Sequence, residues 1–573
     1  MAWQEAYEKW RNHISLDEDL KKQLDAIEGK EKELEDAFYK NLSFGTGGMR
    51  GILGPGTNRM NVYTVRKAVA GLAQYIKQNV KDAKNRGVVI AYDSRHMSKE
   101  FAVEAAKVLG AQGVKAYVFE SLRPTPVLSF AVRHLQTAAG IMITASHNPP
   151  EYNGFKVYNE DGGQAPLEEA EAIIGEVNKI EEELDIPVLS EQELVESNLL
   201  EWIGKKVDQA YLEKLKTIQK REVDGSDLVI VFTPLHGTAY DPVMNGLQQI
   251  GFQHIHVVEE QAKPDPEFST VSSPNPEEHQ AFELAIELGE KVDADILIGT
   301  DPDADRLGVA VKNEAGSYQV LTGNQLGTLL MDYTLSQQSK EDLANGKVIK
   351  TIVTTEMGRA VATHYGVETI DTLTGFKFIG EKIKQFETTN DHFLFGYEES
   401  YGYLIGDFVR DKDAVQAAVA ACEVAHYWKQ QGKTLLEALH ALYERHGFYL
   451  EQMKSLTLQG KEGAEQIAAI MEDIRKRPFE SLAGLQVTAV EDYLASERRL
   501  TKAGKTENIT LPQENVMKFL LENEAWVCFR PSGTEPKIKS YFGVKTNSKE
   551  KSEALVTAIQ QEVEDRIDAI LAK

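Results

Sequence analysis

The segment Ala294–Gly299, which reads ADILIG, is followed at once by Thr300–Arg306, which reads TDPDADR. A run of four to six apolar residues that stops at a polar loop is typical of a buried strand that ends at the edge of a sheet. The same change of character occurs after four other apolar runs, at 87–92, 140–144, 228–232 and 392–395. Helix-like sequence separates these runs, so we expect βαβ units and an α/β fold with parallel or mixed sheets.

Three carboxylates alternate in the loop that follows the first of these runs. Asp301, Asp303 and Asp305 can converge on one point, and ligand sets made only of oxygen select a hard cation such as Mg²⁺ or Ca²⁺. An EF-hand does not fit, because its sixth position requires Gly and holds Arg306, and its twelfth requires Glu and holds Lys312. The alternative is a solvated acidic turn, in which three clustered carboxylates would repel one another. We therefore predict a metal site that also meets a phosphate-bearing ligand.

A serine follows the run at 140–144. Ser146 lies beside His147, with Lys156 ten residues further on, which makes it a candidate nucleophile with acid–base partners. The flanking residues Thr144 and Asn148 exclude the G-x-S-x-G elbow of hydrolases. A Ser-His pair is common, so an ordinary structural loop remains an alternative on this motif alone.

Two further loops have side chains suited to phosphorylated sugars. Arg530–Lys539, which reads RPSGTEPKIK, combines two cations, hydroxyls and a glycine and predicts a phosphate cradle. Glu398 and Ser400 offer acceptors for sugar hydroxyls at a strand end. The Gly-rich loop Phe44–Gly51 lacks both the Walker lysine and the dinucleotide spacing. Each of these loops, taken alone, also fits an ordinary turn.

The composition narrows the class of protein. The chain has 573 residues and a net charge of −26, which argues against nucleic acid or an anionic membrane as a partner. Its 2 cysteines, Cys422 and Cys528, form no disulfide framework and fit a reducing compartment. We see no secretory signal and no membrane span in the sequence, so we expect a cytoplasmic protein.

Together, these loops resemble the α-D-phosphohexomutase family of phosphoglucomutases and phosphomannomutases. Four segments carry the resemblance, in the order of the family: 144–149 as the phosphoserine loop, 299–306 as the metal loop, 396–400 as the sugar loop and 530–536 as the phosphate loop. The extra N-terminal helix and the first glycine loop are similar to the longer subgroup, which includes phosphoglucomutases and enzymes acting on pentose phosphates. Tyr397 and Tyr401 depart from the glycines that the commonest sugar loop has there, which leaves the sugar open.

The resemblance implies a fold and a set of residue roles. The fold is a four-domain phosphohexomutase architecture, with three related α/β domains and a smaller C-terminal α+β domain around a central cleft. Ser146, His147, Lys156 and Arg306 would be catalytic, and Ser146 would bind Mg²⁺ together with Asp301, Asp303 and Asp305. The substrate-binding residues would be Thr46, Arg50, Thr374, Glu398, Ser400, Lys412, Arg530, Ser532, Gly533, Thr534 and Lys539.

We place the domain boundaries at changes in composition and name each domain after the loop that the resemblance assigns to it. They are an N-terminal helical extension of one or two helices at 1–40, a phosphoserine-loop domain at 41–205, a metal-loop domain at 206–320, a sugar-binding domain at 321–450 and a phosphate-binding domain at 451–573.

The reaction implied by the resemblance converts glucose 1-phosphate to glucose 6-phosphate through a phosphoserine, with glucose 1,6-bisphosphate as the bound intermediate. A phosphomannomutase or phosphopentomutase with the same mechanism is the first alternative, and a sugar phosphatase is the second. We find no nucleotide-binding loop in the sequence, which argues against a kinase. The sequence does not fix the oligomeric state.

Overall fold

The computed structural model describes residues 2–45, 47–223, 227–458, 460–532 and 537–572. The chain forms two compact units. The first unit contains Met1–Gly323 and Phe376–Thr434, and the second contains Asn324–Gly375 and Leu435–Lys573. Within the described residues, no helix is long and apolar enough to cross a membrane.

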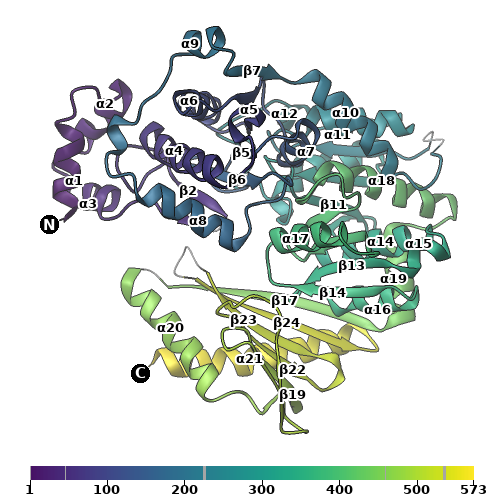
Figure 1. Cartoon of the computed structure of the whole chain (residues 1–573). Coiled ribbons are helices and arrows are strands. Elements are labelled where there is room, and N and C mark those ends of the chain that lie inside the picture. The colour runs from purple at the N-terminus through teal and green to yellow at the C-terminus, as the bar shows by residue number, and fades with distance from the viewer. Residues whose placement is uncertain (1, 46, 224–226, 459, 533–536, 573) are drawn as a thin grey trace. The chain divides into compact units, whose positions relative to one another are not determined.

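The N-terminal extension consists of three helices, where the sequence analysis expected one or two: α1 (Ala2–Arg11), α2 (Glu18–Ala26) and α3 (Glu31–Phe38). Their apolar faces enclose Trp10, which contacts Phe38 and Tyr63 edge-on at ring-centroid distances of 5.8 and 5.3 Å. Tyr63 belongs to α4 (Val62–Asn79), so the extension packs on the first helix of the next segment (Figure 1).

The first sheet has seven strands in the order β1-β2-β6-β5-β3-β4-β7. Strands β3, β4, β5 and β7 run parallel, whereas β6 and β2 are antiparallel to their neighbours. The strands are β1 (Phe44–Gly45), β2 (Gly48–Ile52), β3 (Val88–Tyr92), β4 (Ala116–Phe119), β5 (Ala139–Ile143), β6 (Tyr152–Asn159) and β7 (Leu200–Ile203). The helices between them are α5 (Ala83–Arg86), α6 (Ser98–Ala111), α7 (Thr125–Leu135), α8 (Leu167–Asn178) and α9 (Glu191–Glu196).

The second sheet of this unit has the order β12-β11-β10-β8-β9. Strands β8, β9 and β10 are parallel, and β10, β11 and β12 form an antiparallel meander. The strands are β8 (Ile230–Thr233), β9 (Ile255–Val257), β10 (Ile296–Thr300), β11 (Leu307–Lys312) and β12 (Tyr318–Val320). The nearby helices are α10 (Lys205–Leu215), α11 (Tyr240–Ile250), α12 (Glu259–Ala262) and α13 (Glu283–Val292). The acidic loop therefore closes the β10–β11 hairpin.

The second stretch of the first unit contributes a hairpin and two helices. Strands β15 (His392–Glu398) and β16 (Gly402–Leu404) pair antiparallel, with α17 (Phe376–Phe386) before them and α18 (Ala414–Gln430) after them. Every strand-like run of the sequence analysis overlaps a strand of the structure. The mixed α/β class of the first unit is confirmed.

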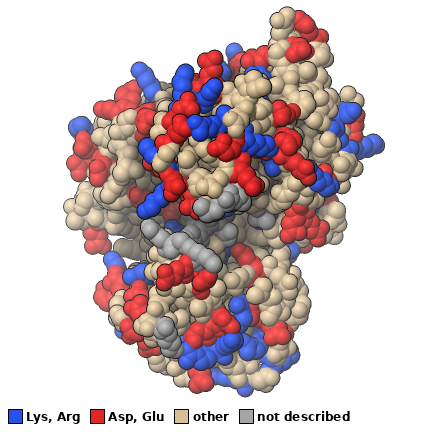
Figure 2. Space-filling model, turned by 90° about the vertical axis from the view of Figure 1, so that its left-hand side faces the viewer, with Lys and Arg blue, Asp and Glu red and all other residues tan. Residues whose placement is uncertain are grey.

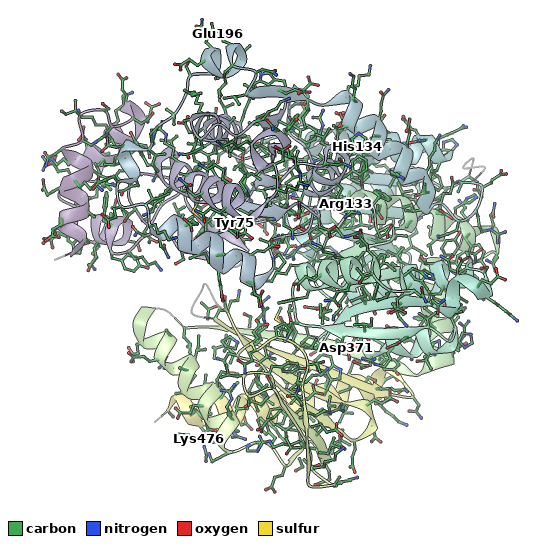
Figure 3. The ribbon with its side chains drawn as sticks, in the orientation of Figure 1. Tyr75, Arg133, His134, Glu196, Asp371 and Lys476 are labelled. Carbon is green, nitrogen blue, oxygen red and sulfur yellow. The ribbon has the colours of Figure 1, made fainter. Side chains whose placement is uncertain are left out.

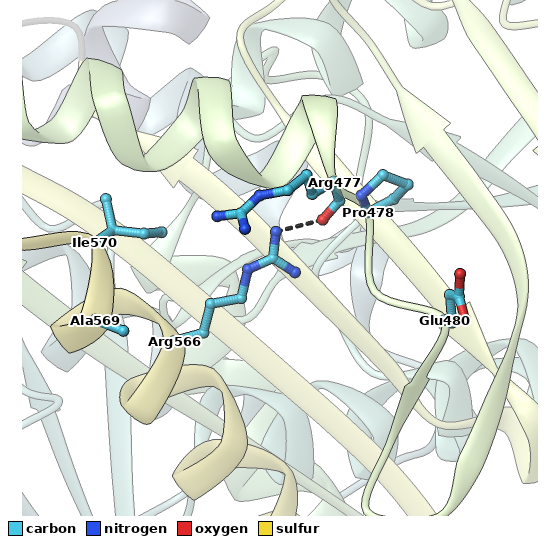
Figure 4. Close-up of a pocket in the computed structure, with 6 residues that line it drawn as sticks. All are labelled: Arg477, Pro478, Glu480, Arg566, Ala569 and Ile570. Carbon is cyan, nitrogen blue, oxygen red and sulfur yellow. Dashed lines mark hydrogen bonds between the residues drawn. The ribbon is translucent and has the colours of Figure 1, made fainter.

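The second unit contains a large antiparallel sheet in the order β17-β24-β23-β22-β19-β20-β21. Its strands are β17 (Phe448–Thr457), β19 (Leu485–Asp492), β20 (Glu497–Leu500), β21 (Lys505–Asn508), β22 (Met517–Leu521), β23 (Trp526–Pro531) and β24 (Lys537–Thr546), and β18 (Ser481–Leu482) pairs with β19. Helices α20 (Gly460–Lys476) and α21 (Lys549–Leu571) share one apolar core with this sheet. Arg566 of α21 donates to the carbonyl oxygen of Arg477, as Figure 4 shows. It also donates to Asp473 of α20, which ties the two helices together.

The remainder of the second unit is a smaller α/β segment. Strands β13 (Gly346–Thr351) and β14 (Glu368–Thr372) pair in parallel, with α14 (Gly323–Ser336), α15 (Lys340–Ala344), α16 (Glu356–His364) and α19 (Leu435–His446). The buried ammonium of Lys350 lies 2.9 Å from Glu356 and 3.1 Å from Asp371, which Figure 3 labels. A buried cation is stabilised only where such partners neutralise it.

A half-buried carboxyl in this unit predicts a pH dependence. Glu451 of β17 accepts hydrogen bonds from Thr355 Oγ1 at 2.5 Å and Asn324 Nδ2 at 3.3 Å. Burial raises the pKa of Glu451 from its ordinary 4.5 to about 7. Between these values the folded chain keeps a proton that the unfolded chain releases, so stability falls as pH rises from 4.5 to about 7 and stays level above.

We expect Glu451→Gln to remove this loss. Above pH 7 the free energy of unfolding of the variant should exceed that of the wild type by about 2–3 kcal/mol. At acidic pH the two free energies of unfolding should be equal. Hydrogen exchange of β17 peptides at a series of pH values measures the difference. Glu497→Gln, at an exposed position of β20, is the matched control and should follow the wild type. A Glu451→Gln profile that keeps the wild-type slope would contradict the assignment.

Both signs of charge are spread over the surface. Figure 2 shows acidic and basic side chains interspersed on the face turned to the viewer, although acidic residues outnumber basic ones by 89 to 63 in the chain. Against this negative background, an anionic ligand needs a local group of positive side chains.

Candidate active site

The acidic loop brings its three carboxylates together. Asp301, Asp303 and Asp305 are 0, 0 and 3 % exposed, and each has an oxygen within 4.8 Å of the others'. One oxygen of Asp301 accepts from the backbone N–H groups of Asp305 and Arg306, both at 3.0 Å, and Ala304 takes a left-handed φ of 54°. The hairpin thus folds back on its first aspartate and directs the other two toward it.

Two carboxylate oxygens in this cluster, Oδ1 of Asp303 and Oδ1 of Asp305, are buried and have no hydrogen-bond partner among the described residues. Burial, with Asp303 and Asp305 close by, raises the pKa of Asp301 well above its ordinary value. Both features are costly without a cation, and a set of carboxylate oxygens suits a hard divalent ion. The residues therefore fit a divalent metal, as the sequence predicted.

Ser146 lies directly against this cluster. It follows β5, and its hydroxyl donates to Asp301 Oδ2 at 2.8 Å and lies 3.2 Å from His147 Nδ1. Its backbone has a left-handed φ of 53°, and its N–H donates to Thr144 Oγ1 at 2.8 Å. Such a backbone costs about 1–3 kcal/mol for a non-glycine residue, so the surrounding structure must hold it. The turn presents the hydroxyl to the metal loop.

Arg95 supplies much of that support, and the sequence analysis did not predict its role. Its guanidinium donates to the carbonyl oxygens of Pro149 at 2.8 Å, Tyr152 at 3.1 Å and Ser146 at 2.6 Å, and also to that of Asn148. Asp93, fully buried, lies 3.4 Å from Arg95 Nε. The Asp-Ser-Arg sequence after β3 was visible, but nothing in it indicated that its partners lie about fifty residues away.

We expect Arg95→Lys to lower kcat by about 10–100-fold with a smaller change in KM, because one ammonium cannot reach four carbonyl groups and Ser146 would be misplaced. Steady-state kinetics measure this split. Arg86→Lys is the matched control, since Arg86 also donates to several carbonyl groups, those of Lys81, Gln136 and Thr137, outside the site. A fall in stability with unchanged kcat would show that Arg95 only supports the fold.

Two lysines neutralise the acidic cluster. Lys156 of β6 lies 2.8 Å from Asp303 and 3.5 Å from Asp305, and Lys412 lies 3.2 Å from Asp305. Burial lowers the pKa of each ammonium, but the aspartates raise the pKa more, so both pKa values lie above the ordinary one. Burial alone would raise the pKa of Asp303, but Lys156 lowers it by more, so the net pKa lies below the ordinary value. Both lysines therefore stay protonated at neutral pH.

His147 has the opposite tendency. Burial, together with the cations of Arg306 and Arg50, holds the pKa of His147 well below its ordinary 6.5. The imidazole is therefore neutral at physiological pH and can exchange a proton with Ser146. Of the two acid–base candidates of the sequence, His147 has its Nδ1 within 3.2 Å of the serine hydroxyl, whereas Lys156 pairs with Asp303 and Asp305.

Arg306 stands at the end of the acidic loop. It forms an ion pair with Glu277, and its Nε is buried without a hydrogen-bond partner among the described residues. Arg50 lies on the other side of the serine loop and donates to Asn148 Oδ1 at 2.7 Å. These two guanidinium groups, with the lysines, form the local positive group that an anionic ligand needs in this acidic chain. Glu277 is a second partner that the sequence did not indicate.

The predicted sugar loop is joined to the acidic hairpin. Tyr401, with a left-handed φ of 64°, accepts a hydrogen bond on its carbonyl oxygen from Leu307 N–H at 3.1 Å. Burial and the neighbouring Glu399 raise the pKa of Glu398 to about 6, against the opposing effect of Lys412 and Arg306. Ser400 is half-buried beside it. The structure thus gathers these residues near the metal loop.

The second unit contains the remaining predicted residues. Arg530 and Lys539 are directly opposite across β23 and β24, so the register places two cations at the mouth of the loop between them. Arg530 pairs with Glu514 at 3.2 Å, and Ser532 N–H donates to the carbonyl oxygen of Lys537 at 2.7 Å. Thr374 follows β14 and is half-buried. The predicted residues Thr46, Gly533 and Thr534 lie outside the described residues.

Comparison with known proteins identifies the family. The chain matches the description "Phosphoglucomutase/phosphomannomutase, alpha/beta/alpha" for domain I over residues 41–184, domain II over 209–316 and domain III over 322–446. It belongs to the phosphoglucomutase/phosphomannomutase family. The resemblance seen in the sequence and the expected phosphohexomutase fold class are both confirmed.

Relatives in this family cover most of the chain. The phosphoglucomutase of Staphylococcus aureus (strain bovine RF122 / ET3-1) is 42% identical over 515 residues, which is 90% of this chain and 91% of that protein. The phosphoglucomutase of Staphylococcus haemolyticus is 39% identical over 514 residues, 90% of this chain and 92% of that protein.

Solved structures of phosphohexomutases show the same fold. Parafusin from Paramecium has a TM-score of 0.67 and 18% identity, covering 93% of this chain and 95% of its own. A phosphoglucomutase/phosphomannomutase family protein from Burkholderia thailandensis has a TM-score of 0.65 and 18% identity, covering 91% and 97%. At this identity the likeness concerns the fold alone.

Proposed function

We propose that this chain is an intramolecular phosphotransferase that interconverts glucose 1-phosphate and glucose 6-phosphate through a phosphorylated Ser146. The observation that carries the proposal is the hydrogen bond of 2.8 Å from the Ser146 hydroxyl to Asp301, in a cluster where two buried carboxylate oxygens have no hydrogen-bond partner among the described residues. A serine so placed can carry a phosphoryl group whose oxygens complete a metal site. The staphylococcal phosphoglucomutases support glucose as the sugar.

We assign the metal as Mg²⁺, held by Asp301, Asp303, Asp305 and an oxygen of phospho-Ser146. When bound, it supplies Lewis-acid stabilisation of the charge on the transferring phosphoryl group. Oxygen ligands alone favour it over softer metals, and Mg²⁺ commonly completes its shell with phosphate oxygens. Glucose 1,6-bisphosphate is the proposed intermediate and activator.

The first half-reaction moves the phosphoryl group from the enzyme to the sugar. The bond between phosphorus and Ser146 Oγ breaks, a bond to the free sugar hydroxyl forms, the hydroxyl loses its proton and Ser146 gains one. His147, neutral and 3.2 Å from Oγ, is placed to accept the proton that the sugar hydroxyl loses and to pass it to Ser146 Oγ, and the second half-reaction reverses this transfer. In a loose transition state charge stabilisation matters more than a strong base, which suits Lys156 and Arg306.

The second half-reaction returns a different phosphate. Once the bisphosphate has turned around, the phosphate that was first on the substrate transfers to Ser146, and the isomeric monophosphate remains. Glu398, Ser400 and Lys412 would bind sugar hydroxyls. We assign the grip on the non-reacting phosphate to Arg530, Ser532, Gly533, Thr534 and Lys539, and further contacts to Thr46, Arg50 and Thr374.

The segmentation of the chain and its location form part of the same proposal. We retain domains at 41–205, 206–320, 321–450 and 451–573 after the extension at 1–40, and the family matches, which begin at 41, 209 and 322, support three of these starts. The net charge of −26 supports an enzyme that binds no nucleic acid, and we propose that it acts in the cytoplasm. Limited proteolysis that cuts near 205, 320 and 450 would agree with these bounds.

A coupled assay tests the function. Purified enzyme receives glucose 1-phosphate, Mg²⁺ and a trace of glucose 1,6-bisphosphate, with glucose 6-phosphate read by a dehydrogenase and free phosphate measured in parallel. We expect glucose 6-phosphate without phosphate release. Turnover only with mannose 1-phosphate or ribose 1-phosphate would move the substrate, and phosphate release alone would identify a hydrolase.

A further inference from the structure

A pocket of about 600 Å³ lies in the first unit and contains none of the residues assigned to catalysis. The loop before α7, the first turns of α10 and the start of α11 form its walls. Its volume lies in the range of roughly 300–1,000 Å³ that small-molecule sites occupy. The apolar and aromatic part of the lining includes Leu122, Val127, Tyr211, Leu212, Tyr240 and Pro242.

Two tyrosines line the pocket. The Tyr211 hydroxyl donates to the Asp413 carboxylate, with oxygen–oxygen distances of 2.9 and 2.8 Å, and this side chain is only 1% exposed, so it forms a fixed boundary of the pocket. Tyr240, at the first position of α11, is 38% exposed and supplies an accessible ring. An accessible aromatic ring favours a planar ligand that stacks or packs edge-on.

The charges of the lining cancel. Arg123 and Asp208 form a bidentate ion pair, in which Nε and Nη2 of the arginine donate to Oδ1 and Oδ2 of the aspartate at 2.8 and 2.9 Å. The other charged lining residues are Lys205 and Asp241, one of each sign, both exposed, and neither forms an ion pair within the described part of the chain. In a chain of net charge −26, a pocket with a neutral lining gives no reason to attract a sugar phosphate. An exposed ammonium and an exposed carboxylate instead match a ligand that carries both charges.

We propose that this pocket is a second ligand site, which binds a small aromatic molecule without net charge, of the zwitterionic amino-acid class. The ring would pack among Leu122, Leu212 and Tyr240, and the ligand's two charges would face Lys205 and Asp241. The proposed ligand is not the substrate of the proposed reaction, and the pocket shares no residue with the catalytic or substrate-binding set.

The walls of the pocket also hold the metal loop from behind. Thr238 donates from N–H and Oγ1 to the carbonyl oxygen of Pro302, at 2.8 and 2.9 Å. Thr125 donates from N–H to the carbonyl oxygen of Asp303 and from Oγ1 to its carboxylate, both at 2.9 Å. A Cβ on Gly237 would come within 2.4 Å of Pro302, so the backbones are in close contact there. A ligand that joins the two walls therefore favours the arrangement that holds Asp303.

Three indole probes that differ only in charge test the ligand class. L-tryptophan carries both charges, indole-3-acetate is an anion and tryptamine is a cation. In saturation-transfer NMR on the full chain at millimolar concentrations, we expect the strongest transfer to L-tryptophan. Equal or stronger transfer to the anion, or no transfer to any probe, would overturn the proposal.

Pocket-filling variants test the location. Leu212→Trp should abolish transfer to L-tryptophan, and Ala262→Trp, at the half-buried rim residue of α12, serves if the first variant fails to fold. Val195→Trp, at a residue of α9 that is 60% exposed, is the matched control and should bind as the wild type does. If saturation transfer to L-tryptophan persists in the filled variants, or if glucose 1-phosphate displaces the probe, the probe binds elsewhere and the proposed site is refuted.

The coupling to the metal loop has its own readout. Mg²⁺ should strengthen binding of L-tryptophan by a few-fold, and by reciprocity the probe should strengthen Mg²⁺ binding equally. Titration of the probe with and without Mg²⁺ measures this in the absence of any turnover. An unchanged dissociation constant would refute the coupling while the site itself is judged by the filling variants.

Discussion

Ser146→Ala should lose about 10⁴-fold or more of the mutase activity, because the proposed reaction has no route that avoids a covalent phosphoserine. The hydroxyl is the only polar group of this side chain, and it donates the hydrogen bond to Asp301. The coupled assay with glucose 1-phosphate and added glucose 1,6-bisphosphate measures the loss. Intact-mass analysis should at the same time show that the variant never gains a phosphoryl group.

The left-handed backbone of Ser146 requires a second variant. Alanine at a φ of 53° is strained, and glycine is not, so Ser146→Gly separates the lost hydroxyl from a disturbed loop. We expect both variants to be equally inactive. Ser197→Ala, at the end of α9 on an exposed surface, is the control and should keep full activity. Retention of most of the activity in either Ser146 variant would exclude the phosphoserine scheme.

Asp303→Asn should weaken binding of the divalent ion by about 10–100-fold and lower kcat by roughly a thousandfold, which corresponds to about 4 kcal/mol of transition-state stabilisation. The amide preserves the shape of the side chain and an acceptor for Thr125, but it removes the charge that faces Lys156. Titration with Mn²⁺, followed by electron paramagnetic resonance, measures the affinity without turnover.

The control for this change is Asp293→Asn. Asp293 is exposed and pairs with Lys312 at the opposite end of β11 from the acidic loop. The Asp293→Asn variant should bind Mn²⁺ as the wild type does. Equal Mn²⁺ affinity in Asp303→Asn and the wild type would show that the acidic cluster is not the metal site.

Local patterns allowed much of the fold and of the site to be predicted from the sequence. Asp301, Asp303 and Asp305 are two residues apart, so a single hairpin suffices to bring them together. The apolar runs before Ser146 and before Asp301 are strands because their side chains are buried on both faces of their sheets. The α/β class follows from the same runs.

The partners that complete the site could not be predicted, because they depend on contacts between residues far apart in the chain. Thr125 and Asp303 are 178 residues apart and bond at 2.9 Å. Arg95 reaches four carbonyl groups of the serine loop, and nothing in its own sequence indicates them. Glu277 pairs with Arg306 from a loop before α13 that carries no recognised motif. Backbone carbonyls have no sequence signature, so residues that bind them are found only in the structure.

A single-turnover transfer experiment tests the central claim most directly. Enzyme carrying ³²P on Ser146 is mixed with excess glucose 1-phosphate and Mg²⁺, and the label is followed by chromatography. The account predicts that the label leaves the protein and appears in glucose 1,6-bisphosphate and glucose 6-phosphate, with none in free phosphate. Label that stays on the protein while glucose 6-phosphate accumulates, or label released as inorganic phosphate, would contradict it.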